Sequence, residues 1–385
     1  ARKMMGVTPN PKLTGVDLLL KECAADLGRA DTFKPSEVGV YFGDPGKTVP
    51  DPYFGGKGPD RTGCNFCGGC MVGCRFGAKN TLDKNYLFFA EKAGTIIFPE
   101  TTVTQIVPLN GAGTTDGYAI HTRHTTGWGP FAERRVFRAR KVILAAGVLG
   151  TLRLLFHCKE IAKTLPWLSR CLGEQIRTNS EALLGSSCKD VPAEPFSTGI
   201  AITSIFHADP HTHVEPVRYS PGSSFMRLLA VPMIDGDHPI LRPLRLLFSL
   251  LIHPLRYLRL LFAPKWAERT IIFLVMQTID STMRFKWGRG LFTLFRRDLV
   301  AADNSDGTSR KIQVFNPLGH QIARAFAKRT NGLPQNGINE VILGIPSTAH
   351  ILGGCAIGKD AAHVVIDVNH EVFGYPGMYV CDGSA

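Results

Sequence analysis

The sequence predicts a mixed α/β chain, α+β overall, whose first domain is interrupted by a second domain with an antiparallel sheet. The apolar run Lys141–Gly147 ends in glycine, and residues 148–157 continue with helical spacing. A strand, a small-residue turn and a helix in this order are typical of α/β domains. Residues 200–207 and 270–277 instead have the composition of longer antiparallel strands. We therefore expect both architectures in one chain.

The composition changes near residue 175 and changes back near residue 345. We expect a first domain at 1–174 that includes a β-meander at 95–140. A second domain, with an antiparallel sheet and covering helices, is expected at 175–345, and residues 346–385 return to the first domain. The first domain is therefore discontinuous in sequence.

Helical spacing of apolar residues behind an acidic residue predicts a helix at 14–27, and a short strand is expected at Val38–Phe42. Residues 43–63 are rich in Gly, Pro and Asp, which predicts a loop. A second helix is expected at Leu82–Ala93, where Gly94 ends it.

Short β-branched and aromatic runs predict strands in both domains. In the meander these runs are Ile96–Phe98, Val103–Val107, Tyr118–His124 and Arg135–Arg138. In the second domain they are Ile200–His207, Val217–Ser220, Thr270–Gln277 and Lys311–Phe315.

The amino-acid composition limits the classes of molecule that we expect the protein to bind. The 385 residues are 44% hydrophobic, and the formal net charge is +12. A basic balance suits nucleic acid, an anionic membrane surface or an acidic ligand. Because the basic residues are dispersed and no zinc finger, RNA-binding signature or basic tail is present, we expect no nucleic-acid partner. Ten cysteines, four of them clustered, favour a reducing compartment, so we expect a cytoplasmic location, peripheral at the membrane.

The cysteine cluster comprises Cys64, Cys67, Cys70 and Cys74. This is the spacing of the ferredoxin run, in which thiolates bind an iron–sulfur cluster. Arg75 stands where ferredoxins have proline, however, and the chain has no second cysteine run. Zinc binding is one alternative. The other is a glycine-rich turn in which the cysteines pack as small structural residues.

Residues 240–263 form the most apolar stretch, but four arginines interrupt it. Since an arginine near a bilayer centre costs about 2.5–3.5 kcal/mol, we expect no membrane span. The polar side chains expected to share one helical face are Arg242, Arg245, Ser249, His253 and Arg256. Pro254 is expected to divide the stretch into two short helices. This pattern is typical of helices that lie on a membrane surface; the alternative is a hairpin that covers the protein's own core.

His350 precedes the pair Gly353–Gly354, and the last strand-like run stops at Asp382–Gly383. Glycines let backbone approach a ligand closely, and α/β sheets bind ligands at the carboxyl ends of their strands. Without further context, a satisfied core histidine is the favoured interpretation of His350.

Three segments, taken in order, supply that context. They are the stretch from Val38 to Tyr86, which includes Gly-Ala-Lys-Asn-Thr-Leu-Asp-Lys-Asn-Tyr, then Ala139–Leu155, then the stretch from His350 to Ser384. Together they resemble the glucose–methanol–choline (GMC) family of flavin oxidoreductases, and most closely its bacterial cholesterol oxidase branch. The resemblance implies a Rossmann-like FAD-binding domain at 1–174 and 346–385, and a substrate-binding domain at 175–345.

The sequence also departs from the family pattern. Family members have an amino-terminal Gly-x-Gly-x-x-Gly and a carboxyl-terminal segment with an active-site Asn, the Asn-Pro segment, and neither is present here. We therefore expect the chain to be a fragment with an incomplete FAD-binding domain.

The resemblance implies a role for each matching residue. His350 would act as the base or hydrogen-bond partner that faces the flavin N5 and the alcohol hydroxyl. Gly353 and Gly354 would let backbone approach the isoalloxazine. The residues that would contact other parts of FAD are Val103, Ala145, Ala146, Gly147, Asp382 and Gly383.

The function that this resemblance implies is FAD-dependent oxidation of an alcohol, with a sterol 3β-hydroxyl as the favoured donor and O2 or another acceptor. Glu340 is a candidate, by location, for the carboxylate that would move a steroid double bond. A second hypothesis is a dehydrogenase of another hydrophobic alcohol that passes electrons through an iron–sulfur cluster at Cys64–Cys74. A third, non-enzymatic hypothesis is a cofactor-free remnant that binds membranes.

Overall fold

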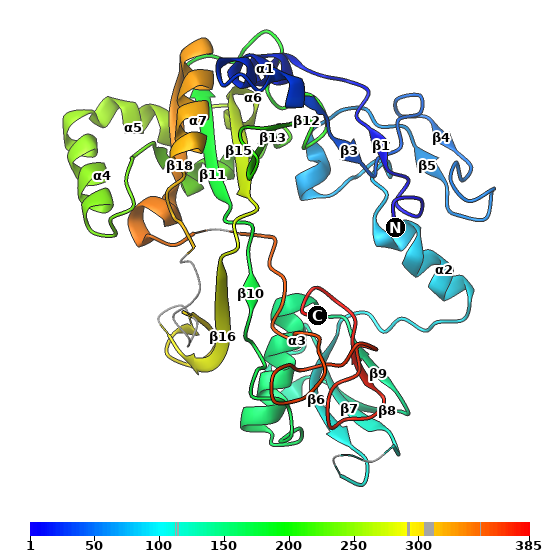
Figure 1. The fold of residues 1–385 in the computed structure, drawn as a ribbon. Helices are drawn as coiled ribbons and strands as arrows, with labels where there is room; N and C mark the ends of the chain where they lie inside the picture. Colours follow the sequence, from blue (N-terminus) through cyan, green and yellow to red (C-terminus); the bar gives the residue numbers. More distant parts are fainter. Residues whose placement is uncertain (112, 114, 291–292, 304–311, 347) are drawn as a thin grey trace. The chain divides into compact units, whose positions relative to one another are not determined.

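The computed structural model describes residues 1–111, 113, 115–290, 293–303, 312–346 and 348–385 (Figure 1). The chain forms two compact units, and several segments of sequence contribute to each. Unit 1 comprises Ala1–Ile96, Ser180–Ile279 and Gln313–Thr348, and unit 2 comprises Ile97–Asn179, Asp280–Ile312 and Ala349–Ala385. Each unit has a hydrophobic core of its own.

Unit 1 is built on a seven-stranded antiparallel sheet in the order β14-β18-β11-β15-β13-β12-β2. The strands are β2 (Lys34–Pro35), β11 (Ala182–Cys188), β12 (Ser204–His207), β13 (Thr212–Val217), β14 (Ala230–Pro232), β15 (Thr270–Gln277) and β18 (Gly332–Gly337). In the centre of the sheet, Leu184 lies opposite Phe273 on one side and Asn336 on the other.

Helices α1 (Gly15–Asp26) and α7 (Pro317–Arg329) pack against this sheet and against each other (Figure 1). Helix α1 begins in a capping box, in which the Asp17 carboxylate accepts hydrogen bonds from the N–H and the hydroxyl of Thr14, both at 2.7 Å. Helix α7 begins with proline behind Asn316, whose side chain accepts a first-turn N–H at 2.8 Å.

The rest of unit 1 consists of short elements. Strand β1 pairs with β3, and β4 pairs with β5. Their bounds are β1 (Thr8–Pro9), β3 (Glu37–Val38), β4 (Thr48–Val49) and β5 (Arg61–Thr62), and the short helices are α2 (Tyr86–Lys92) and α6 (Trp266–Arg269).

The apolar stretch forms the two short helices that the sequence predicts, α4 (Leu241–Ile252) and α5 (Pro254–Leu261), with His253 between them. We refer to residues 240–263 as the α4–α5 hairpin. No helix in the described ranges is long and apolar enough to cross a membrane.

The orientation of α4 is not evident from the spacing of its residues. Arg242, one of the polar residues expected to share a helical face, is only 2% exposed. Its guanidinium lies 3.8 Å from the buried Glu340 carboxylate. The apolar side chains face outward instead, since Leu251 is 72% and Phe248 is 64% exposed.

Unit 2 contains the predicted strand–turn–helix. Strand β9 (Val142–Leu144) is followed by α3 (Gly147–Phe156), and β9 pairs in parallel with β19 (Met378–Val380). Leu152 and Leu155 of α3 are fully buried in the unit 2 core. A parallel strand pair next to a helix is the arrangement of α/β proteins.

Two antiparallel sheets of three strands complete unit 2. One is the predicted meander, β6 (Thr101–Pro108), β7 (Tyr118–His124) and β8 (Arg134–Ala139). The other has the order β10-β16-β17 and consists of β10 (Ile176–Arg177), β16 (Thr282–Arg289) and β17 (Arg297–Ala302).

The structure confirms most of the local predictions, and the misses are informative. Ile96–Phe98 form no strand, and residues 200–207 form one only from Ser204 onward. The strand predicted at Val217–Ser220 lies earlier in the sequence, because β13 ends at Val217. Lys311 lies outside the described residues, and 312–315 form no strand. The sequence did not indicate β11, β16, β17, β18 or α7.

The division into domains at 1–174, 175–345 and 346–385 stays a prediction, and the compact units divide the chain differently at two places. Residues 1–96 belong to unit 1, because α1 packs on α7 and on β12 and β13. Residues 280–312 belong to unit 2, because β16 pairs with β10.

Candidate active site

The turn between β9 and α3 exposes three small residues, Ala145, Ala146 and Gly147, at the amino end of a helix. Gly147 has φ +70°, and a Cβ added there would meet no atom within 4 Å. The backbone N–H groups of a helix amino end attract anions. The space beside Gly147 is therefore open, at a helix end that suits a phosphate.

Asp382 follows β19 and reaches the same helix end. Its carboxylate accepts hydrogen bonds at 2.5 Å from the hydroxyls of Thr151 and Ser384. Burial acts to raise the pKa of Asp382, but the hydrogen bonds from Ser384, Thr151 and the Gly147 N–H outweigh burial and hold the pKa below its usual range. Asp382 is thus a fixed anion, and its side chain caps α3.

The glycine pair connects the His350 segment to the end of β19. The Gly353 N–H donates to the Gly383 carbonyl at 2.7 Å. A Cβ on Gly353 would lie 2.3 Å from the Gln175 carbonyl oxygen, and one on Gly354 would lie 2.6 Å from Leu152 Cδ1. Close packing within the protein therefore requires both glycines, independently of any ligand.

His350 has an exposed side chain in unit 2, so the structure excludes the satisfied core histidine. Its Nδ1 lies 3.0 Å from Nδ2 of Asn179. The sequence analysis missed Asn179, because nothing in the sequence around residue 179 relates it to a histidine 171 positions away.

Val103, the remaining predicted FAD contact, lies on β6, where a register shift separates it from Gln105. All nine predicted catalytic and cofactor residues belong to unit 2. Hydrogen bonds join the 145–147 turn, the glycine pair and the 382–383 segment into one cluster. Val103 belongs to a different sheet of the same unit.

The structure gives no support for a metal centre at the cysteine cluster. The described residues include all four thiols, and among them no group of three or more His, Cys, Asp or Glu could hold a metal ion. The thiols line a cavity of about 10 Å³, the space of a single water molecule. Burial raises the pKa of Cys64 to about 11, whereas at Cys74 burial is outweighed by backbone hydrogen bonds, which lower the pKa. The iron–sulfur prediction is not supported.

Glu340 lies in a buried polar cluster of unit 1. It accepts the Leu183 N–H at 3.0 Å and lies 3.8 Å from Arg242. Burial raises the pKa of Glu340 to about 7, although the Leu183 N–H and Arg242 both favour the charged form. A carboxyl group that titrates near neutral pH can carry out acid–base chemistry.

His320 continues this cluster. Its Nδ1 lies 2.6 Å from Asp235, and its Nε2 lies 3.0 Å from Nδ2 of Asn336. Burial lowers the pKa of His320 to about 4, although the nearby Asp235 carboxylate acts to raise it. A neutral ring that donates from Nδ1 and accepts at Nε2 satisfies both contacts. Asn336 also reaches Glu340 at 3.5 Å, so the cluster is continuous.

Residues 58–158 match the amino-terminal model of the GMC oxidoreductases, and residues 297–385 match the carboxyl-terminal model. A cholesterol oxidase from Acinetobacter baumannii is 41% identical over the whole chain, which covers 68% of that protein. This chain belongs to the GMC oxidoreductase family. A cholesterol oxidase from Mycobacterium tuberculosis H37Rv is 42% identical, and the chain covers 66% of it. The GMC chain thus spans about two thirds of the length of these relatives.

A solved structure of a mutant formate oxidase from Aspergillus oryzae RIB40 resembles the fold of this GMC chain with a TM-score of 0.51. The match is 11% identical and covers 98% of this chain and 67% of that one. GMC oxidoreductases are FAD-dependent and act on CH–OH donors. The open amino end of α3, with its small exposed residues, fits such a cofactor.

Proposed function

We propose that the chain takes part in the FAD-dependent oxidation of a hydrophobic alcohol, and that the donor is a sterol 3β-hydroxyl. The observation that carries this proposal is the unit 2 cluster, which joins the turn at 145–147 to the segments that contain His350 and Asp382. The choice of a sterol rests on the relatives named cholesterol oxidase.

The turn at 145–147 and the amino end of α3 would hold FAD, which would supply the hydride acceptor for oxidation of the carbinol carbon. His350 takes the hydroxyl proton at Nε2, so that the alcohol becomes a ketone. Nε2 has a free lone pair only if Nδ1 carries the ring proton. Asn179 lies with Nδ2, which is a donor, 3.0 Å from Nδ1, so it supports the tautomer with the proton on Nδ1 only after its amide turns to present Oδ1. We propose Asn179 as the residue that sets the tautomer of His350.

The test measures FAD binding and then flavin reduction by cholesterol. The purified chain should bind FAD, as visible flavin absorbance that stays with the protein on gel filtration. His350→Ala should retain FAD and slow flavin reduction about 10²–10⁴-fold. Asn179→Ala should also shift the pH profile of the reduction rate, and Asn179→Asp should restore part of the rate. A change below threefold in His350→Ala would remove this residue from the mechanism.

We further propose O2 as the electron acceptor. Oxygen consumption that matches substrate oxidation would support an oxidase. Reduction of an artificial dye without oxygen consumption would indicate a dehydrogenase instead.

We also propose that the protein is cytoplasmic and contacts a membrane surface through the α4–α5 hairpin. Sterols are membrane lipids, and the hairpin presents large apolar side chains outward, including Phe248, Leu251 and Leu255. A helix pair with an exposed apolar face and flanking arginines is typical of interfacial binding. Flotation of the protein with liposomes tests this contact.

A further inference from the structure

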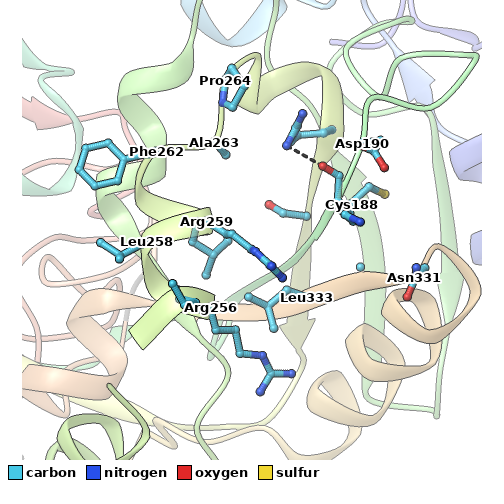
Figure 2. Close-up of a pocket in the computed structure, with 16 residues that line it drawn as sticks. Cys188, Asp190, Arg256, Leu258, Arg259, Phe262, Ala263, Pro264, Asn331 and Leu333 are labelled. Carbon is cyan, nitrogen blue, oxygen red and sulfur yellow. Dashed lines mark hydrogen bonds between the residues drawn. The ribbon is translucent and has the colours of Figure 1, made fainter. Parts of the chain in front are cut away.

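A cavity of unit 1 lies between α5 and the ends of β11 and β18 (Figure 2). It has a volume of about 790 Å³ and is open to solvent. Leu258 and Phe262 line it from the helix, and Leu333 lines it from the sheet. This volume lies within the range of small-molecule sites.

Basic side chains dominate the charge of this cavity. Arg256, Arg259, Arg269 and Lys189 line it, against the single carboxylate of Asp190. Arg259 extends from α5 toward Leu333 (Figure 2). Arg269 donates through Nη1 to the Lys189 carbonyl at 2.8 Å, and its buried Nε has no partner. An anion in the cavity would complement this excess positive charge.

We propose that this cavity binds one anionic phospholipid, with the phosphate between Arg256, Arg259 and Arg269 and the first acyl carbons against Leu258 and Phe262. Arginine binds phosphate oxygens through two parallel N–H donors, and the neighbouring leucines provide apolar surface. The cavity therefore suits a ligand with an anionic and an apolar end better than it suits a free anion.

The phospholipid is favoured over other anionic amphiphiles because the cavity continues the apolar face of the hairpin. Leu258 and Phe262 line the cavity and are also exposed on α5. This step rests on the membrane contact proposed above. A lipid held here would give the protein a preference for anionic membranes, which the apolar face alone would not provide.

The test compares two double variants of the full chain in flotation with phosphatidylcholine vesicles, with and without phosphatidylglycerol. Arg256→Gln/Arg259→Gln removes two charges from the cavity. The control Lys3→Gln/Lys21→Gln removes two exposed charges from unit 1 at residues that neither line the cavity nor belong to the hairpin. Each basic residue near an anionic surface is worth about fivefold in affinity, so the cavity variant should lose about 25-fold on anionic vesicles. It should bind pure phosphatidylcholine as the wild type does.

A second measurement is calorimetric titration with short-chain phosphatidylglycerol below its micelle concentration, with octanoate and inorganic phosphate in parallel. Saturable 1:1 binding of the lipid, weakened in the cavity variant only, would support the proposal. It fails if octanoate or phosphate binds as tightly, if the lipid does not saturate, or if the control variant loses as much. This titration uses dissolved lipid and no membrane. It therefore tests lipid binding in the cavity independently of the proposed contact between the hairpin and a membrane.

Discussion

Asp17 and Arg218 are both fully buried in unit 1, and their charged groups lie 3.9 Å apart. Asp17 also accepts hydrogen bonds at 2.5 Å from Thr203 and Ser204, and Arg218 donates to Thr203 at 2.9 Å. This pair connects the start of α1 to the sheet. Removing one partner of a buried pair leaves an uncompensated charge, which costs about 3–5 kcal/mol.

We therefore predict that Asp17→Ala lowers the free energy of unfolding of unit 1 by about 3–5 kcal/mol, as measured by urea denaturation. The double variant Asp17→Ala/Arg218→Met should recover part of this loss, because no unpaired charge remains. The exposed pair Arg2–Glu37 is the control, and Glu37→Ala should change stability little. Equal effects of Asp17→Ala and Glu37→Ala would contradict the assignment.

Glu340 gives the stability of unit 1 a defined dependence on pH. Its pKa is raised from 4.5 to about 7, so the native state binds more protons than the unfolded state between these values. The contribution of Glu340 is therefore complete below about pH 4.5 and is lost as the pH rises through 7. His320 acts in the opposite sense, since its pKa is lowered to about 4 and its contribution is lost as the pH falls.

The variant Glu340→Gln separates the pH dependence due to Glu340 from that due to His320, because His320 is unchanged in the variant. We predict that the stability of the wild type relative to Glu340→Gln falls between pH 5 and pH 8, by on the order of 3 kcal/mol at most. Urea unfolding curves at the two pH values provide the measurement. A difference that does not change with pH would mean that Glu340 is charged throughout.

At the scale of elements, the α4–α5 hairpin is oriented with its leucines outward and Arg242 inward. The Arg242 guanidinium also donates to the Ile234 carbonyl at 3.1 Å and to the Glu340 carbonyl at 3.3 Å, which holds the start of α4 against unit 1. The exposed residues of the hairpin contribute little to folding, so they can be replaced without loss of the fold.

We predict that the triple variant Phe248→Ser/Leu251→Ser/Leu255→Ser folds normally and loses binding to all vesicles. Each apolar side chain that enters the membrane contributes about 1.5–3 kcal/mol, so the loss should exceed 100-fold. Val368→Ser serves as the control, since Val368 in unit 2 is as exposed as Leu251. Unchanged flotation of the triple variant would refute a membrane role for the hairpin.

At the scale of the molecule, each unit has its own fully buried core residues, such as Phe273 in unit 1 and Leu152 in unit 2. Chains with more than one core commonly unfold in more than one step. We predict two calorimetric transitions. Phe273→Ala should lower one and Leu152→Ala the other, because each creates a cavity worth about 2–5 kcal/mol.

Hydrogen exchange assigns each transition to a unit. Faster exchange in β15 should accompany Phe273→Ala, and faster exchange in α3 should accompany Leu152→Ala. A single transition that both variants lower would show that the two cores unfold together.

The sequence by itself determined the features that depend on neighbours along the chain. The helix at 14–27, the strand at 118–124 and the strand–turn–helix at 141–157 follow from periodicity, turn residues and caps, which act within a few residues. The motifs around His350 and Asp382 were local as well, and together with the segments at 38–86 and 139–155 they indicated the family.

Tertiary structure decided what depends on distant partners. Periodicity placed Arg242 on one helical face with other polar residues, and only Glu340, 98 positions away, shows that Arg242 points into unit 1. Asn179 became the partner of His350, and β11 was placed between β15 and β18, by pairings that span long loops. Such pairings are selected by burial and hydrogen bonding in the folded chain, which no short stretch of sequence encodes.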